Sequence, residues 1–250
     1  MRFRPHAHPL NWYPYEVTGS VGLLSAYVED IEEQVRKGID DYQLRAATVL
    51  VEPQFDEEPT RVVTVHKALD NETWDLTEIF ENYFPGLQRR SALVTLFSFF
   101  EHELEALCKR IKSHGHHKIA LADMANKGIM RSTVYLEKVG GLTALRSNPE
   151  WQEINNIQSI RNLIVHADGK IPGQTGGNSE KVAAYIQRSP HLQGDREIAI
   201  LKGYLAHTLH TFEAYFSKLH VSIECKYGAA SLKSLDTDRQ QQEAVSRQIL

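Results

Sequence analysis

The chain of 250 residues is 42% apolar and 24% charged, which is typical of a soluble globular protein with one large domain or two small ones. Its net charge of −4 excludes bulk attraction to nucleic acid, so any such binding requires a local basic patch. Cys108 and Cys225 fall in apolar helical patterns, which favours buried thiols over a disulfide. We find no signal-peptide pattern and no apolar run of membrane-spanning length, so we expect a cytoplasmic protein that does not enter membranes.

The first third of the chain predicts an arm, a helix and a small β element. Prolines at 5, 9 and 14 among aromatic residues indicate an irregular arm that docks on its own chain or on a second subunit. In chain order, the predicted elements are the arm (1–17), a helix capped by Ser20 (20–47), two β-branched runs that form a hairpin or a folded-over loop (48–52 and 61–66), and a short amphipathic helix stopped by Pro85-Gly86 (70–85).

The clearest predicted helix spans about residues 87–113. Its apolar seam is unbroken and wide enough for a core helix, with the members Leu93, Leu96, Phe97, Phe100, Leu104, Leu107 and Ile111. Glu103 falls inside the apolar arc and Glu101 flanks it. Either carboxylate could pair with Arg161 if the two helices pack together, and the alternative is that both skirt the core rim and reach water.

A basic, histidine-rich turn follows this helix. Its cations are Lys109, Arg110, Lys112 and Lys118, and its histidines are His114, His116 and His117. Three histidines in four residues lack the spacing and the acidic or thiol partners of a metal site, so no metal is expected. The turn is interpreted as a solvated loop or as a patch that contacts RNA phosphates.

The remaining elements complete a mostly α protein. They are a helix closed by Gly140-Gly141 (119–140), a helix that ends on Gly169 (151–169), a Gly- and Pro-rich segment that could form a mobile flap (168–193) with a helical piece (179–188), a long helix ended by Gly228 (196–227) and a polar tail (229–250). We therefore predict an antiparallel helical bundle with a small β-hairpin insertion and an N-terminal arm. The domain division expected is 1–88, 89–228 and 229–250.

The helix over residues 151–169 contains the main candidate site. At about 100° per residue, Ile160, Ile164 and Val165 gather around Ile157, and Arg161 falls within this apolar stripe. Polar residues line the other side, namely Asn155, Ser159, Asn162 and His166. An arginine in an apolar arc is costly unless a carboxylate, a phosphate or another subunit receives it.

The order of the motifs FFEHELEAL and SIRNLIVHADG, followed by a long C-terminal helix, resembles the HEPN superfamily over residues 89–228. Many members carry an arginine, four to six residues and a histidine, often with a polar residue after the arginine, and Arg161, Asn162 and His166 match this pattern. The bare pattern also occurs at Arg61–His66 and from Arg110 to His116 or His117. Only the Arg161 copy combines a helix, an asparagine and a place before the last long helix.

The resemblance implies a metal-independent ribonuclease without a cofactor, in which a 2′-hydroxyl attacks the adjacent phosphate. Histidine can move the protons and arginine can stabilise the phosphoryl charge. Arg161 and His166 are about 140° apart around the helix, so a homodimer that abuts two such helices would form the site. The resemblance also implies a toxin or phage-defence role, with an antitoxin or regulatory partner. The alternative is a non-catalytic HEPN-like module that binds a nucleotide, RNA or a protein, and a metal-dependent hydrolase is a third interpretation.

Overall fold

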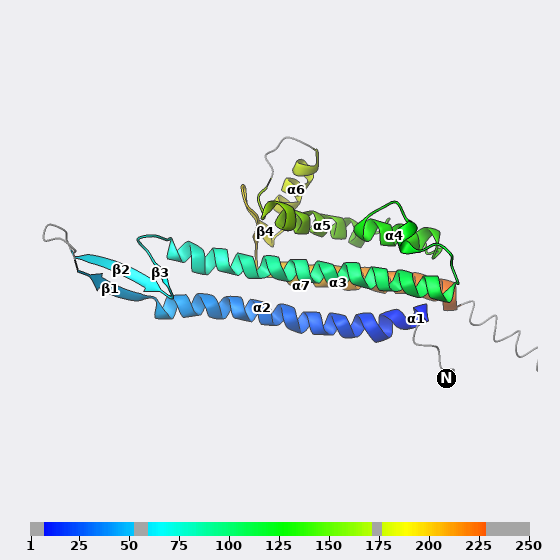
Figure 1. The fold of residues 1–250 in the computed structure, drawn as a ribbon, viewed down its shortest axis with the longest axis horizontal. Helices are drawn as coiled ribbons and strands as arrows, with labels where there is room; N and C mark the ends of the chain where they lie inside the picture. Colours follow the sequence, from blue (N-terminus) through cyan, green and yellow to red (C-terminus); the bar gives the residue numbers. More distant parts are fainter. Residues whose placement is uncertain (1–7, 53–59, 172–176, 229–250) are drawn as a thin grey trace, which may run out of the picture. The chain divides into compact units, whose positions relative to one another are not determined.

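The computed structural model describes residues 8–52, 60–171 and 177–228 (Figure 1). The chain divides into two compact units: unit 1 comprises residues 1–24, 96–158 and 207–250, and unit 2 comprises residues 25–95 and 159–206. The helices are α1 (Pro9–Trp12), α2 (Thr18–Arg45), α3 (Phe84–His114), α4 (Gly128–Lys138), α5 (Pro149–Ala167), α6 (Gly177–Arg188) and α7 (Tyr204–Ile223). The mostly α prediction is confirmed, and none of the described helices is both long and apolar enough to cross a membrane.

The prediction of an irregular N-terminal arm is wrong for its described part. Helix α1 is followed by a π-helical segment, Tyr13–Val17, that continues directly into α2. Pro9 stands in the first turn of α1, where a missing N–H costs nothing, and the His8 side chain accepts a hydrogen bond from the backbone N–H of Leu10. Pro14 lies near the start of the wide π turn, so it does not break the helix. The arm does dock on its own chain, because Trp12 is fully buried in unit 1.

The β-branched runs form the predicted hairpin in unit 2. Strands β1 (Ala47–Val51) and β2 (Arg61–His66) pair antiparallel with Val49 opposite Val63, and β3 (Leu69–Asp70) adds a short third strand beside β2. His66 is buried where the sheet meets its supporting helices, with its ring 4.6 Å from the Phe80 ring and 5.5 Å from the Tyr42 ring. The hairpin is therefore anchored through the inner face of β2.

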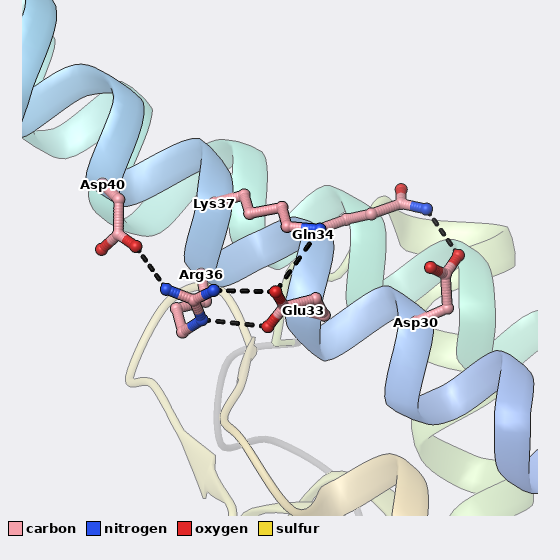
Figure 2. Close-up of polar contacts among 6 residues, drawn as sticks. All are labelled: Asp30, Glu33, Gln34, Arg36, Lys37 and Asp40. Carbon is pink, nitrogen blue, oxygen red and sulfur yellow. Dashed lines mark hydrogen bonds and ion pairs between the residues drawn. The ribbon is translucent and has the colours of Figure 1, made fainter.

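Helix α2 of unit 2 carries a charged face made of local pairs (Figure 2). Arg36 donates to Glu33 one turn before it and to Asp40 one turn after it, at 2.7 and 2.5 Å. The hydrogen bond from Arg36 lowers the pKa of Glu33 to about 2. Such pairs between residues three or four apart stabilise the helix itself, and their exposure indicates that this face of α2 meets water.

Helix α3 begins earlier than predicted. A π-helical segment, Glu78–Tyr83, leads without a break into α3 at Phe84, so Pro85-Gly86 does not stop the helix. The wide π turn that precedes Pro85 accommodates the proline ring, which a regular α turn would not. The predicted core role of α3 is confirmed, because every member of its apolar seam is fully buried. Within unit 2, α3 is joined to α2 by a bidentate pair between Arg89 and Glu32.

Two predicted helices are shorter in the structure. The helix expected over 119–140 is a 3-10 turn, Leu121–Asp123, followed by α4, which starts at Gly128 and ends before Gly140-Gly141 as predicted. The helix expected over 196–227 begins only at Tyr204, because residues 192–193 (β4) and 199–200 (β5) pair as short antiparallel strands and Gly203 adopts a φ of +98°. A π-helical segment, Glu224–Gly228, extends α7 to the predicted glycine. The polar tail lies outside the described residues.

The core of unit 1 is an aromatic cluster between α3 and α7. Phe100 stacks on Phe212 and Phe216, with ring centroids 4.5 and 5.0 Å apart. Phe97 contacts Phe212, and His114 contacts Tyr227 beyond the end of α7, so the two helices run in the same direction. Helix α7 runs antiparallel to α5, which it meets through the pairs Glu153–His207 and Glu150–Lys218.

Candidate functional site

The buried face of α5 differs from the predicted apolar stripe. The buried residues recur every three positions, at Trp151, Ile154, Ile157, Ile160 and Leu163. A step of three residues turns back by about 60° around an α-helix, so the buried face rotates along α5 and reaches Leu163 at its end. Val165 is 47% exposed as a result, and Arg161 is half-buried at the edge of the core rather than inside it. The prediction that Val165 belongs to the apolar stripe around Ile157 is wrong for this reason.

The three motif residues lie on the last turns of α5, within unit 2. Arg161 Nη1 donates a hydrogen bond to Asn162 Oδ1 at 3.0 Å, which orients the guanidinium along the half-exposed side of the helix. His166 is exposed one turn after Asn162. By helical geometry, Val165 lies between Arg161 and His166 around the helix axis. The outward face therefore presents a cation, an amide, an imidazole and one apolar side chain.

The C-terminal end of α5 is anchored by backbone contacts within unit 2. Asp168 and Gly169 adopt φ values of +51° and +77°, and the Gly169 N–H donates to the Leu163 carbonyl, so two left-handed residues close the end of the helix. Residues 169–171 then pair with residues 196–198 through the bonds Ile198 N to Gly169 O and Ile171 N to Arg196 O. The predicted flap is thus fixed at its start, its helical piece is α6, and residues 172–176 lie outside the described residues.

Arg90 of α3 supports this helix end and was not recognised from the sequence. Its Nη2 donates to the Glu197 carboxylate and to the Ile198 carbonyl, both at 2.6 Å, and the residue is buried. A Cβ at position 169 would stand 3.0 Å from the Arg90 guanidinium carbon, so only glycine leaves room for this arrangement. Because Glu197 lies 107 positions further along the chain, no local pattern identifies this contact.

Glu103 is buried as its place in the apolar arc predicts, and in unit 1 its partner is Trp12. The Trp12 indole Nε1 donates to Glu103 Oε2 at 3.0 Å. Burial raises the pKa of Glu103, and the indole hydrogen bond opposes that shift. Glu101 is half-buried. Arg161 belongs to unit 2, so the pairing of Arg161 with either carboxylate stays a prediction.

The basic turn does not act as one patch. Arg110 is half-buried and forms an ion pair with Glu16 of the N-terminal helical segment, so its charge is neutralised within unit 1. Lys109 and Lys118 are exposed, and Lys112 is half-buried. Of the four predicted RNA-contact residues, the three lysines therefore remain candidates, whereas Arg110 is already paired with Glu16.

The histidines of this turn have separate surroundings. The His114 ring packs against the rings of His8 and Tyr227, and burial lowers the pKa of His114. His116 is exposed with a φ of +49°. Within residues 8–52, 60–171 and 177–228, no group of three or more His, Cys, Asp or Glu side chains is arranged to hold a metal ion.

The other copies of the motif have different surroundings. Arg61 and His66 are five positions apart on β2 and so point to opposite faces of the sheet. Arg61 forms an exposed pair with Glu72, whereas His66 is buried. In the Arg110 copies, the arginine is tied to Glu16 and the histidines lie beyond the end of α3. The Arg161 copy is the one in which arginine and histidine stand on one continuous helix.

Comparison with known proteins gives no further assignment. No family model, curated protein or solved structure matches this chain. The candidate site therefore stands on its own residues and on the resemblance of its motif.

Proposed function

We propose that this protein is a HEPN-type, metal-independent endoribonuclease that cleaves RNA by attack of a 2′-hydroxyl on the adjacent phosphate. The observation that carries the proposal is the end of α5, where Arg161, held by Asn162, and the exposed His166 stand five residues apart on one helix. These residue types supply the proton transfer and the charge stabilisation that the reaction needs. The resemblance of the motif to the HEPN superfamily supplies the reaction class.

Each residue has a role that follows from its chemistry. Arg161 offers a planar donor fork to the phosphoryl oxygens, where negative charge grows in the transition state. His166 takes the proton from the 2′-hydroxyl or gives one to the leaving 5′-oxygen, because an imidazole can act as a general base or a general acid. Asn162 fixes the guanidinium through its side-chain oxygen. Its amide N–H groups stay available for a phosphate oxygen.

The active form in this proposal is a homodimer. Arg161 and His166 lie about 140° apart on α5, so one helix does not direct both at one phosphate. A two-fold axis at this face would place the arginine of each copy near the histidine of the other. Val165 is 47% exposed between Arg161 and His166, so in this arrangement it would lie at the two-fold axis.

The test compares RNA cleavage by the wild type and His166→Ala in the presence of EDTA. The expected result is EDTA-resistant cleavage that leaves 2′,3′-cyclic phosphate and 5′-hydroxyl ends, lost in His166→Ala. His210→Ala is the matched control, because His210 is an exposed histidine on another helix, α7. Cleavage that persists in His166→Ala, or that requires a divalent metal, contradicts the proposal.

The dimer is tested separately. Val165→Glu should give a monomer in sedimentation experiments and lose cleavage, while Val221→Glu should remain dimeric and active, since Val221 is a comparably exposed valine on α7. A wild-type monomer that cleaves RNA at micromolar concentration contradicts the composite site.

A non-catalytic module that binds RNA, a nucleotide or a protein is the second candidate function. The net charge of −4 and the neutralisation of Arg110 by Glu16 favour it, because both reduce the attraction of the chain for RNA. Its expected outcome is the absence of cleavage in the wild type and in His166→Ala alike. A toxin or phage-defence role, and an antitoxin or regulatory partner, belong to the first candidate.

A further inference from the structure

A concave site lies in unit 1, between α3 and the segment that precedes α4. It is a half-open hollow of about 330 Å³, which is at the lower end of the range for small-molecule sites. Its walls are apolar and come from Cys108, Ala120, Leu121, Ala122 and Tyr135. A hollow with these walls can remove an alkyl or aryl group from water.

The walls of the hollow are fixed by contacts behind them. The Cys108 thiol donates to the Ser132 carbonyl, and burial raises its pKa to about 12, so the thiol is neutral at physiological pH. The Tyr135 hydroxyl donates to the Ile119 carbonyl at 3.0 Å, and its ring is fully buried. The hollow is therefore preformed rather than a gap between mobile side chains.

The rim of the hollow is cationic. Lys109, Lys112 and Arg131 stand there against one carboxylate, Glu105, which pairs with Arg131 at 3.1 Å. Among the described residues, neither lysine has an ion pair or a hydrogen bond through its side chain. Within the part of the chain that the structure describes, Arg131 Nε is buried and has no hydrogen-bond partner, so the charge of Arg131 is compensated only by its pair with Glu105.

We propose that this hollow binds a small organic acid, with the apolar body against Leu121 and Ala122 and the carboxylate at Lys109, Lys112 and Arg131. Apolar walls alone would accept any apolar molecule. The uncompensated rim charge selects an anionic head group and disfavours a cationic one. The proposal concerns unit 1 alone and does not depend on the ribonuclease activity.

The first experiment varies the head group on one tail, using isothermal titration calorimetry of the full chain with octanoate, octanol and octylamine. Octanoate is expected to bind about tenfold or more tightly than octanol, since one charge-assisted hydrogen bond supplies a difference of that order. Octylamine is expected not to bind. Equal affinity for octanoate and octanol, or no binding of octanoate, overturns the proposal.

The second experiment locates the ligand with matched variants. Lys109→Gln/Lys112→Gln should weaken octanoate about tenfold, while Lys127→Gln/Lys138→Gln, which removes two exposed lysines elsewhere in unit 1, should leave the affinity unchanged. Ala122→Phe should block the hollow. Ala125→Phe is its control, because Ala125 is exposed in the same segment and does not line the hollow.

Thermal unfolding of each variant checks that the fold is kept, which is expected because the changed residues are exposed or half-buried. Unchanged octanoate affinity in a folded Ala122→Phe protein overturns the assignment of the site. If the wild type does not bind octanoate and Lys109→Gln/Lys112→Gln loses RNA binding, the proposal is also overturned. The two lysines are then assigned to phosphate contact.

Discussion

Helices α3 and α5 each carry a charged residue that the sequence places within an apolar pattern, Glu103 and Arg161, and the structure gives the two different surroundings. Glu103 in unit 1 is buried and accepts a hydrogen bond from the fully buried Trp12. Arg161 in unit 2 is half-buried, bonded to the neighbouring Asn162, and one turn from the exposed His166. The first arrangement is directed inward at the N-terminal segment, whereas the second lies at the edge of the core beside an exposed imidazole.

This difference shows how a charge in an apolar pattern can be interpreted. A buried charge needs a partner that compensates for lost hydration, and a partner within the chain indicates a structural role. A charge at the edge of the core keeps part of its hydration and stays accessible to a ligand. Glu103 fits the first case and Arg161 the second, so the two regions should respond differently to mutation.

The largest expected effect belongs to the structural contact. Trp12→Ala should lower the free energy of unfolding by about 3–5 kcal/mol, because it leaves a large cavity and removes the donor to Glu103. Urea denaturation followed by circular dichroism measures the change. Tyr15→Ala should stay within about 0.5 kcal/mol of the wild type, since Tyr15 is 72% exposed in the same segment. Equal effects of the two substitutions would contradict the anchoring role of Trp12.

At the outward site, the expected loss is in activity rather than in stability. Arg161→Ala should reduce RNA cleavage about a hundredfold or more, as loss of one preorganised donor to a growing charge does, and Arg161→Lys should restore only part of it. The free energy of unfolding should change by about 1 kcal/mol, because the side chain is half-exposed. Arg61→Ala changes another copy of the motif, and this variant should cleave RNA like the wild type. If Arg161→Ala loses cleavage only because it unfolds, then Arg161 has a structural role like that of Glu103.

Much of the fold follows from the sequence where a pattern repeats over many residues. The seam of α3 is an example, since seven apolar residues at helical spacing all prove to be buried. The hairpin is another, because its two β-branched runs differ in composition from the helices around them. These features depend on local periodicity, which a single sequence contains.

The predictions that the structure contradicts also have local physical causes. Pro9, Pro14 and Pro85 were interpreted as helix breakers, but they stand in a first helical turn or beside wide π turns, where the ring fits. On α5, buried residues at every third position turn the buried face away from Val165. At the candidate site, the three motif residues were recognisable, whereas the support from Arg90 depends on a contact between distant segments.

The pH dependence of the free energy of unfolding tests the burial of Glu103. Because burial raises the pKa of Glu103 above its ordinary value of 4.5, the unfolded chain releases this proton first as the pH rises. The contribution of Glu103 to stability therefore falls from about pH 4.5 until the pH exceeds the raised pKa. Glu103→Gln keeps an oxygen acceptor for Trp12 and has no proton to lose. Its free energy of unfolding relative to the wild type should rise over that pH window, and a flat difference would mean that Glu103 is hydrated.

The smallest expected effect tests the support beneath the outward site. Gly169→Ala should lower the free energy of unfolding by about 1–2 kcal/mol, because φ is +77° and the new methyl group would meet the Arg90 guanidinium. Gly22→Ala, in an open position of α2, should instead raise stability by about 0.5–1 kcal/mol. If the end of α5 positions His166, then Gly169→Ala should also slow RNA cleavage in protein that is still folded, and Gly22→Ala should not. Cleavage at the wild-type rate in folded Gly169→Ala would show that His166 acts without the anchor formed by Arg90, Glu197 and the backbone of residues 169–171.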